Sequence, residues 1–172
     1  RLAVLDGLDR VIRIGSFSKT LSASVRCGYI AARPEWIEGL VDLQIATSFA
    51  GPSPMATELI AGILAGGSYR KHMDELRQRL ARARKEVIGR LAPLGIEPWV
   101  LPRGGFYLWC RLPHGLDSSI VAQRCLEKGV VLAPGNVFSA SQSAASFMRF
   151  NVAQMSDPRI FATLAGALED GG

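Results

Sequence analysis

The amino-acid sequence predicts an α/β fold that ends in a compact α+β unit. Two strand-like runs near the start, Arg10–Ile14 and Gly28–Ala32, are followed by segments with helical periodicity. A long amphipathic helix then occupies the middle of the chain. After Pro93, short strand-like runs alternate with capped helices. With 172 residues, 48% of them hydrophobic, the chain is long enough to bury a core of its own.

Three helices are expected in the first half of the chain. Pro34 suits a first helical turn, and residues 35–47 place apolar and polar side chains at helical period. Ser53 is expected to cap a second helix that begins at Pro54 and stops at Gly66-Gly67. Because its body, Met55–Ala65, is apolar nearly all round, this second helix is predicted to be buried.

The second half is expected to fold as strands with helices packed on one face. Asp117 is predicted to cap a helix that runs to Lys128, and Asp157-Pro158 to open a last helix that ends near Leu168. The predicted strands are Ile96–Leu101, Phe106–Leu112, Val130–Leu132 as a short buried strand, and Phe147–Val152. Gly104-Gly105 falls in the turn between the first two of these strands.

The net charge of +5 raises the question of nucleic-acid binding. Residues 70–90 hold eight basic and three acidic side chains, so this one segment accounts for the whole excess. The same segment carries an apolar stripe at steps of three and four, which is typical of a helix with one face in contact with a core. No aromatic residues are interleaved with the basic ones. A solvated helix face is therefore favoured over a DNA-binding surface.

The remaining bulk features exclude several classes. Nothing in the sequence is long and apolar enough to span a membrane, and the chain starts without a secretory signal or an initiator Met. Cys27, Cys110 and Cys125 have no paired spacing, and with two isolated histidines they form no metal signature. Reduced thiols in the cytoplasm are the simplest interpretation.

The stretch Ser16–Tyr29 places Lys19 and Arg26 among five hydroxyl side chains, between two strand-like runs. A nucleotide-binding phosphate loop is disfavoured because Ser18 precedes the lysine where that motif has glycine, and because the spacing from Gly15 is too short. A surface lysine on a polar loop is the plain alternative. The third possibility is a lysine that forms a Schiff base with pyridoxal 5'-phosphate (PLP), since hydroxyls and a cation nearby could hold the phosphate dianion.

The residues of this stretch resemble a known family. Ser16-Phe17-Ser18-Lys19-Thr20-Leu21, followed by Arg26-Cys27-Gly28-Tyr29, is similar to the lysine motif of the fold-type I, PLP-dependent class I/II aminotransferases. Three later stretches resemble the same family in the same order, namely Pro102–Trp109, Gly129–Gly135 with Phe138, and Met148-Arg149-Phe150-Asn151. The resemblance covers almost the whole chain, so an accidental motif in a domain that only packs is the least favoured interpretation.

The resemblance implies roles for individual residues. Lys19 would bind PLP as a Schiff base and carry protons during catalysis, while Ser16, Ser18 and Arg26 would bind the cofactor phosphate. Arg149 would bind the carboxylate of an amino acid or 2-oxo acid in a bidentate pair, for which arginine is better suited than lysine. The family also implies a homodimer. No metal is expected.

The resemblance further implies that this chain is a C-terminal portion of a PLP-dependent transferase fold. Residues 1–68 would be the remnant of the large domain with its edge strands, 69–92 a long bridging helix, and 93–172 the complete small domain. Ala23-Ser24 stands where Pro-Gly is common in the family. The family's aspartate for the pyridine nitrogen has no counterpart in residues 1–15. The chain by itself is therefore expected not to transaminate.

Two functions of the parent protein remain open. Tyr69-Arg70-Lys71-His72 and the Ser22-Ala23-Ser24 stretch resemble the aminotransferase-like domain of MocR-type transcriptional regulators of the GntR group. Such a regulator would bind DNA only through a winged-helix domain outside this chain. This function is slightly favoured, and the alternative is a free-standing amino acid aminotransferase.

Overall fold

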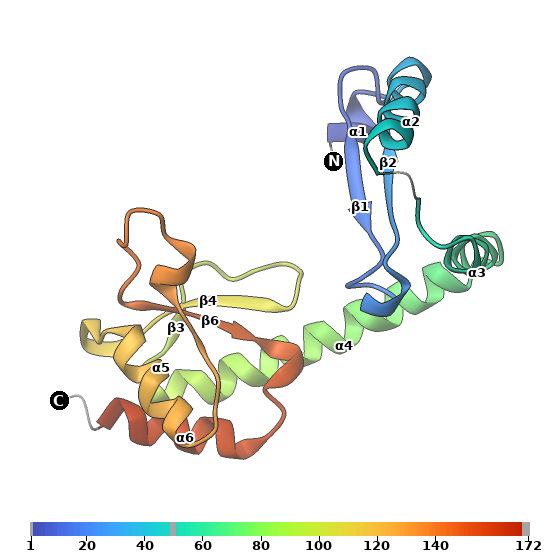
Figure 1. Cartoon of the computed structure of the whole chain (residues 1–172). Helices are drawn as coiled ribbons and strands as arrows, with labels where there is room; N and C mark the ends of the chain where they lie inside the picture. Colours follow the sequence, from blue (N-terminus) through green and yellow to red (C-terminus); the bar gives the residue numbers. More distant parts are fainter. Residues whose placement is uncertain (1, 49–50, 170–172) are drawn as a thin grey trace. The chain divides into compact units, whose positions relative to one another are not determined.

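The computed structural model describes residues 2–48 and 51–169. The chain divides into two compact units, unit 1 (Arg1–Met73) and unit 2 (Asp74–Gly172), and each unit is described by itself. Unit 1 contains the following elements, labelled in Figure 1: α1 (Leu2–Leu5), β1 (Arg13–Ser16), β2 (Gly28–Ala31), α2 (Pro34–Ser48) and α3 (Pro54–Ala65). The long helix α4 (Ser68–Leu91) begins in unit 1 and ends in unit 2, and it is the amphipathic helix expected in the middle of the chain.

Strands β1 and β2 pair in antiparallel fashion, with Ile14 opposite Ile30 and Ser16 opposite Gly28. The first strand begins later than predicted because the backbone N–H groups of Arg10 and Val11 donate instead to Asp6 Oδ2, at 2.7 and 3.0 Å. Apolar side chains of both strands are exposed. Ile14 is 76% exposed and Ile30 is 45% exposed.

Helix α3 has the predicted bounds but not the predicted burial. It begins at Pro54, and Gly66 and Gly67 follow its last residue as expected. Ile60 is its only buried residue, whereas Met55 is 83% exposed. The Ser53 side chain makes no capping hydrogen bond, so this predicted cap is also wrong. Apolar composition predicts burial only where a second surface covers the helix, and of the residues of α3 the described part of unit 1 buries Ile60 alone.

Unit 2 is built on a four-stranded antiparallel sheet with strand order β3-β4-β6-β5. Its central pair is β4 with β6, in which Trp109 lies opposite Arg149. The elements of unit 2 after α4 are β3 (Glu97–Pro98), β4 (Tyr107–Arg111), α5 (Ser118–Glu127), β5 (Ala133–Pro134), β6 (Phe147–Asn151) and α6 (Pro158–Glu169).

Local signals predicted the two C-terminal helices well. Asp117 caps α5, since its Oδ1 accepts a hydrogen bond from Ser119 N at 2.7 Å. Asp157 acts in the same way at the start of α6, where its Oδ1 accepts from Arg159 N at 2.9 Å. The edge strands were predicted less well. Only Glu97–Pro98 of the run 96–101 is a strand, and pairing after α5 is confined to Ala133–Pro134. Val131, predicted as part of a buried strand, is 80% exposed.

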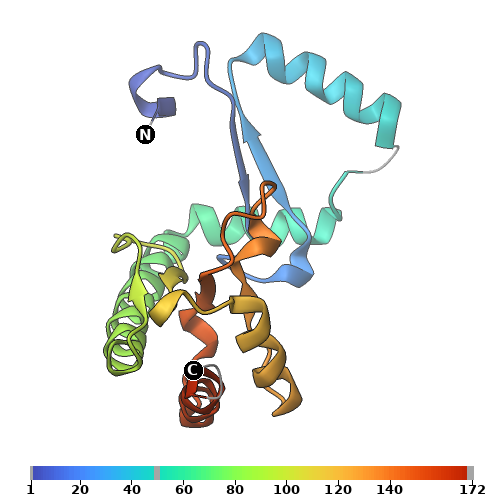
Figure 2. The same cartoon turned by 90° about the vertical axis from the view of Figure 1, so that its left-hand side faces the viewer.

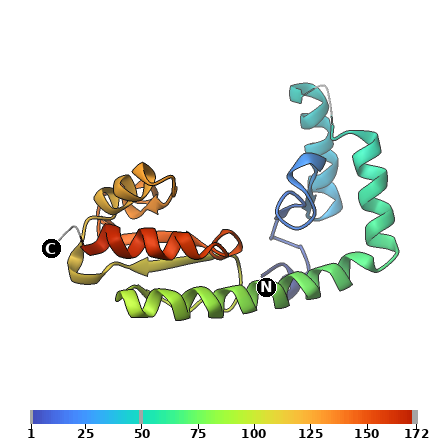
Figure 3. The same cartoon turned by 90° about the horizontal axis from the view of Figure 1, so that it is seen from below.

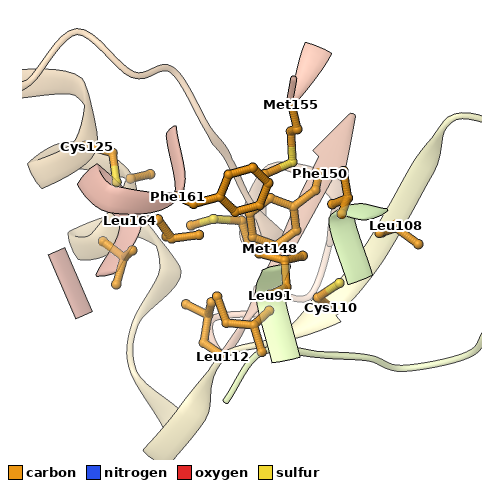
Figure 4. Packing of buried hydrophobic residues seen from close by; sticks show 14 of the residues in the cluster. Leu91, Leu108, Cys110, Leu112, Cys125, Met148, Phe150, Met155, Phe161 and Leu164 are labelled. Carbon is orange, nitrogen blue, oxygen red and sulfur yellow. The ribbon is translucent and has the colours of Figure 1, made fainter. Parts of the chain in front are cut away.

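The helices of unit 2 cover one face of its sheet, as predicted. Figure 2 shows the C-terminal part of α4, then α6, then α5 along this face, and Figure 3 shows α6 beside α4 from a second direction. Side chains alternate across the strands, so that Leu108 and Cys110 of β4 and Met148 and Phe150 of β6 point into the core (Figure 4). The helices supply Leu91, Cys125 and Leu164 to the same core. Trp109 and Arg149 therefore lie on the opposite face.

The basic side chains of α4 are partly engaged within the chain. Arg77 pairs with Asp74 at 2.7 Å and Arg90 with Glu86 at 3.0 Å. Arg84 donates to the carbonyl oxygen of Gly105 at 2.7 Å. These contacts agree with a solvated helix face. In the part of the chain that the structure describes, no helix combines the length and the apolar character needed to cross a membrane.

Candidate functional site

Lys19 lies in a tight turn at the end of the β1–β2 hairpin. The ladder continues one residue beyond β1, because Phe17 N donates to Cys27 O at 3.1 Å. Phe17 and Cys27 are both buried, at 6% and 7% exposure, and anchor the base of the turn. The N–H groups of Thr20 and Leu21 then both donate to Phe17 O. Lys19 itself is exposed, so its amine is presented to solvent from a backbone that is fixed on both sides.

The other predicted residues of this stretch gather around the same turn. Ser16 and Ser18 flank Phe17, and Arg26 precedes Cys27 on the opposing side of the hairpin. The register of the two sides therefore brings Ser16, Ser18 and Arg26 close to Lys19. The backbone N–H of Ser18 donates to Ser16 Oγ at 3.2 Å. Within residues 2–48 and 51–169, neither Lys19 nor Arg26 has a carboxylate within ion-pair distance. The turn therefore carries two uncompensated positive charges and two hydroxyls.

Arg26 has a backbone conformation that is unusual for its residue type. Its φ of 45° and ψ of 37° lie in the left-handed region, which costs a residue with a Cβ about 1 kcal/mol. A glycine or asparagine would adopt this conformation more readily.

Helix α4 contributes two contacts to the turn that sequence reasoning missed. Tyr69 Oη donates to Thr20 Oγ1 at 3.1 Å, and His72 Nε2 lies 2.6 Å from Thr20 O. The ring of Tyr69 also meets the ring of Phe17 edge-on, with 5.9 Å between the centroids. The unusual cluster Tyr69-Arg70-Lys71-His72 was the available signal, but nothing in the sequence pairs it with Thr20.

Arg149 lies in unit 2, on the face of β6 that the helices leave open. Its guanidinium carbon is 4.1 Å from the ring centroids of both Tyr107 and Phe138. Phe138 in turn packs edge-on against Trp109, which stacks on Phe147 with 5.4 Å between the centroids. Contacts with two aromatic rings stabilise the cation and restrict its orientation, while its N–H groups stay available at the edge. Among the described residues, no carboxylate forms an ion pair with Arg149.

Arg149 also lines a cavity of about 590 Å³ in unit 2, a volume in the range of small-molecule sites. The charged side chains on its walls are Lys128, Arg149, Asp157 and Arg159. Asp157 is already bound to Arg159 at 2.6 Å, and the hydrogen bonds from Arg159 lower the pKa of Asp157. The uncompensated charge of the cavity is therefore positive, which favours an anionic ligand. The other lining residues include Tyr107, Asn151, Gln154, Val130, Leu132 and Ile160.

Two of the three cysteines, Cys110 and Cys125, are buried in the core of unit 2. Burial raises the pKa of the Cys110 thiol to about 12, and burial also raises the pKa of Cys125 although Lys128 acts in the opposite sense. Both thiols are therefore protonated and poorly nucleophilic near neutral pH. No group of three or more His, Cys, Asp or Glu side chains in the described ranges could hold a metal ion.

The sequence of this chain matches a known protein family over most of its length. The sequence model described as "Aminotransferase class I and II" matches residues 1–164. The chain belongs to this family. Its relatives include both enzymes and regulators. It is 30% identical to "Aromatic-amino-acid aminotransferase 1" of Thermococcus litoralis, over 90% of this chain and 37% of that protein. It is 27% identical to YdfD of Bacillus subtilis, described as an uncharacterized HTH-type transcriptional regulator, over 90% of this chain and 32% of that protein.

Solved structures of PLP aminotransferases have the same fold. Kynurenine aminotransferase of Pyrococcus horikoshii matches with a TM-score of 0.84 and 27% identity, covering 99% of this chain and 43% of that one. LysN, an α-aminoadipate aminotransferase of Thermus thermophilus that was solved with N-(5'-phosphopyridoxyl)-L-leucine, matches with a TM-score of 0.77 and 28% identity, covering 98% and 44%. The chain thus spans less than half the length of these relatives, and its fold corresponds to a C-terminal α/β portion of theirs.

Proposed function

We propose that this chain is the C-terminal portion of a PLP-dependent, aminotransferase-like protein in which Lys19 carries the cofactor and Arg149 binds the carboxylate of an amino acid or 2-oxo acid. One observation carries the proposal. The turn presents Lys19 together with Ser16, Ser18 and Arg26, and the strained Arg26 has no carboxylate partner among the described residues. The proposed division into a large-domain remnant (1–68), a bridging helix (69–92) and a small domain (93–172) follows from the same resemblance.

The residues of the turn fit the cofactor that the family implies. The phosphate of PLP is a dianion with three acceptor oxygens, and the turn offers one guanidinium and two hydroxyls. When bound, PLP supplies an aldehyde for covalent attachment to a lysine amine and a ring that withdraws electrons from the substrate. Arg26 would neutralise phosphate charge. When it is not attached to the cofactor, the Lys19 amine would be the group that moves protons.

In unit 2, Arg149 would bind a carboxylate through two parallel N–H groups at its open edge. Contacts with Tyr107 and Phe138 fix the plane of the guanidinium and therefore the direction from which the carboxylate enters. The cavity beside it supplies apolar surface for the rest of the ligand. LysN, whose solved complex contains a phosphopyridoxyl amino acid, supports this ligand class by similarity.

For the parent protein we propose a transcriptional regulator of the MocR type, active as a cytoplasmic homodimer that binds DNA through a domain outside this chain. The HTH-type regulators among its relatives and the Tyr69–His72 cluster support this. The second candidate is a free-standing aminotransferase, which the 30% identity to the Thermococcus litoralis enzyme favours. A winged-helix sequence ahead of Arg1 in the parent would decide for the regulator. Its absence, with turnover of amino acids by the full-length protein, would decide for the enzyme.

Reductive trapping tests the role of Lys19. The chain has four lysines, Lys19, Lys71, Lys85 and Lys128, and all four are exposed, so exposure alone cannot favour one of them. We expect PLP followed by borohydride to label Lys19 roughly tenfold more than the others, because phosphate contacts to a cation are worth more than about 1 kcal/mol. Peptide mass spectrometry gives the ratio, and Lys19→Ala should leave only the uniform background.

Two controls sharpen this experiment. Pyridoxal, which lacks the phosphate, should label the four lysines evenly. Arg26→Asn should abolish the preference for Lys19 without unfolding the turn, since asparagine tolerates the left-handed conformation found at Arg26. If PLP itself labelled the four lysines equally, this result would contradict the proposed phosphate site in this chain.

A further inference from the structure

One face of α4 holds the residue that directly follows Lys19. Tyr69 binds the side chain of Thr20 and His72 binds its backbone carbonyl, at 3.1 and 2.6 Å. Because Tyr69 and His72 are three residues apart on a helix, they lie on the same face. Both are half-buried. All three residues belong to unit 1.

The contact with the carbonyl requires a hydrogen on Nε2 of the His72 imidazole. A carbonyl oxygen can only accept, so Nε2 of His72 must carry the hydrogen and donate it to Thr20 O. The neutral Nε2–H tautomer and the imidazolium both satisfy this requirement, whereas the Nδ1–H tautomer does not. His114, the second histidine of the chain, is exposed and has no side-chain hydrogen bond within the described part of the chain, so it provides an internal control.

The same face of α4 also contacts the residue at the other end of the turn. Phe17 is buried against Tyr69, and Phe17 O accepts from the N–H groups of Thr20 and Leu21 at 3.2 and 2.8 Å. The backbone before Lys19 and the backbone after it are therefore both anchored through α4. Lys19 lies between these two anchored positions.

We propose that Tyr69 and His72 are positioning residues for Lys19, which hold Thr20 and its peptide group with Leu21 so that the amine of the preceding residue is presented in a fixed direction. The proposal rests on the proposed function of Lys19 as the cofactor-bearing residue. A fixed backbone lowers the entropy that is lost when the amine and an aldehyde adopt their reactive arrangement. It also gives a role to the Tyr69–His72 cluster, which the cofactor contacts leave unexplained.

The contact itself can be tested without any cofactor. In the whole chain, His72→Ala should speed hydrogen exchange at the amides of Thr20 and Leu21 by roughly threefold to tenfold, the effect of one lost hydrogen bond. His72→Gln should restore slow exchange, because the Gln amide group can donate from nearly the position of Nε2. His114→Gln should change nothing. Imidazole ¹⁵N shifts should show a hydrogen on Nε2 of His72.

The proposal would be overturned if exchange at the Thr20 and Leu21 amides were unchanged in His72→Ala, or if it were as fast in His72→Gln as in His72→Ala. It would also be overturned if Nε2 of His72 carried no hydrogen. Tyr69→Phe keeps the ring against Phe17 and removes only the hydroxyl, so it should give a smaller increase in exchange than His72→Ala. Amides of unit 2 should exchange at the wild-type rate in every variant, which shows that the chain is still folded.

Trapping with PLP then connects the contact with Lys19. His72→Ala should lower the preference for Lys19 over the other lysines at least roughly threefold, and His72→Gln should keep it. If wild-type protein shows no preference, the proposed function of Lys19 fails, while the exchange data still decide the contact. If the preference survives in His72→Ala although exchange is faster, the positioning role is refuted and the cofactor site stands.

Discussion

Replacing Gly135 with alanine is expected to lower the free energy of unfolding of unit 2 by about 3 kcal/mol. A Cβ atom at this position would lie 2.6 Å from the carbonyl oxygen of Phe147, and closer still to that of Ala144. Both are backbone atoms, which cannot rotate away as a side chain can. Gly135 N also donates to the buried Ser118 Oγ at 3.1 Å, so any shift of the loop weakens this bond.

Chemical denaturation in a Trp36→Phe background, in which Trp99 and Trp109 of unit 2 are the remaining tryptophans, would measure this loss by fluorescence. Gly89→Ala is the matched control, because a Cβ there meets no atom within 4 Å and the residue lies inside α4. Alanine should stabilise that helix by about 0.5–1 kcal/mol, an effect of opposite sign. A Gly135→Ala protein within about 1 kcal/mol of wild type would mean that the loop moves aside easily.

The second large effect is expected at Arg149. Arg149→Leu should weaken binding of a simple 2-oxo acid, such as 4-methyl-2-oxopentanoate, at least roughly tenfold, because a bidentate and charge-assisted pair is lost. Arg149→Lys should weaken binding by less, since it keeps the charge but loses the planar fork. Titration followed by NMR of the side-chain N–H groups of arginine and of Trp109 would give the dissociation constants.

Arg111 offers a matched control for Arg149 on the same open face of the sheet. Its guanidinium lies 5.9 Å from the ring centroids of Trp99 and Phe147, but Arg111 does not line the cavity. Arg111→Leu should therefore leave affinity for the 2-oxo acid unchanged. Equal losses in the Arg111 and Arg149 variants would show that general positive charge, and not a defined pair with Arg149, attracts the ligand.

Much of the fold was predictable because its signals are local. Asp117 and Asp157 lie within two residues of the amides that they cap, so sequence spacing alone indicates both helices. Burial was predicted less well, because it depends on a partner surface. The apolar residues of Met55–Ala65 and Val130–Leu132 satisfy the pattern of buried elements, yet Met55 and Val131 are among the most exposed hydrophobic residues.

The same distinction applies to the candidate site. Ser16, Ser18, Lys19 and Arg26 fall within one short stretch, so motif and spacing were enough to select them. The contacts of Thr20 with Tyr69 and His72 join residues 49 and 52 positions apart, and no local rule pairs them. The packing of Tyr107 and Phe138 against Arg149 depends likewise on strand register and loop path, which only the folded chain defines.

The two units differ in how much apolar surface each one buries. In unit 1 the buried cluster consists of Phe17, Cys27 and Ile60, whereas unit 2 has the far larger core drawn in Figure 4. Local opening is easier where fewer side chains are buried. A ligand stabilises only the states that it binds, by an amount that rises with the logarithm of its free concentration once the site is mostly occupied. A ligand bound at the turn that carries Lys19 would therefore make the opening of unit 1 rarer and leave the melting of unit 2 unchanged. A melting curve dominated by the larger core would miss such a ligand. Hydrogen-exchange protection measured at individual amides would detect it.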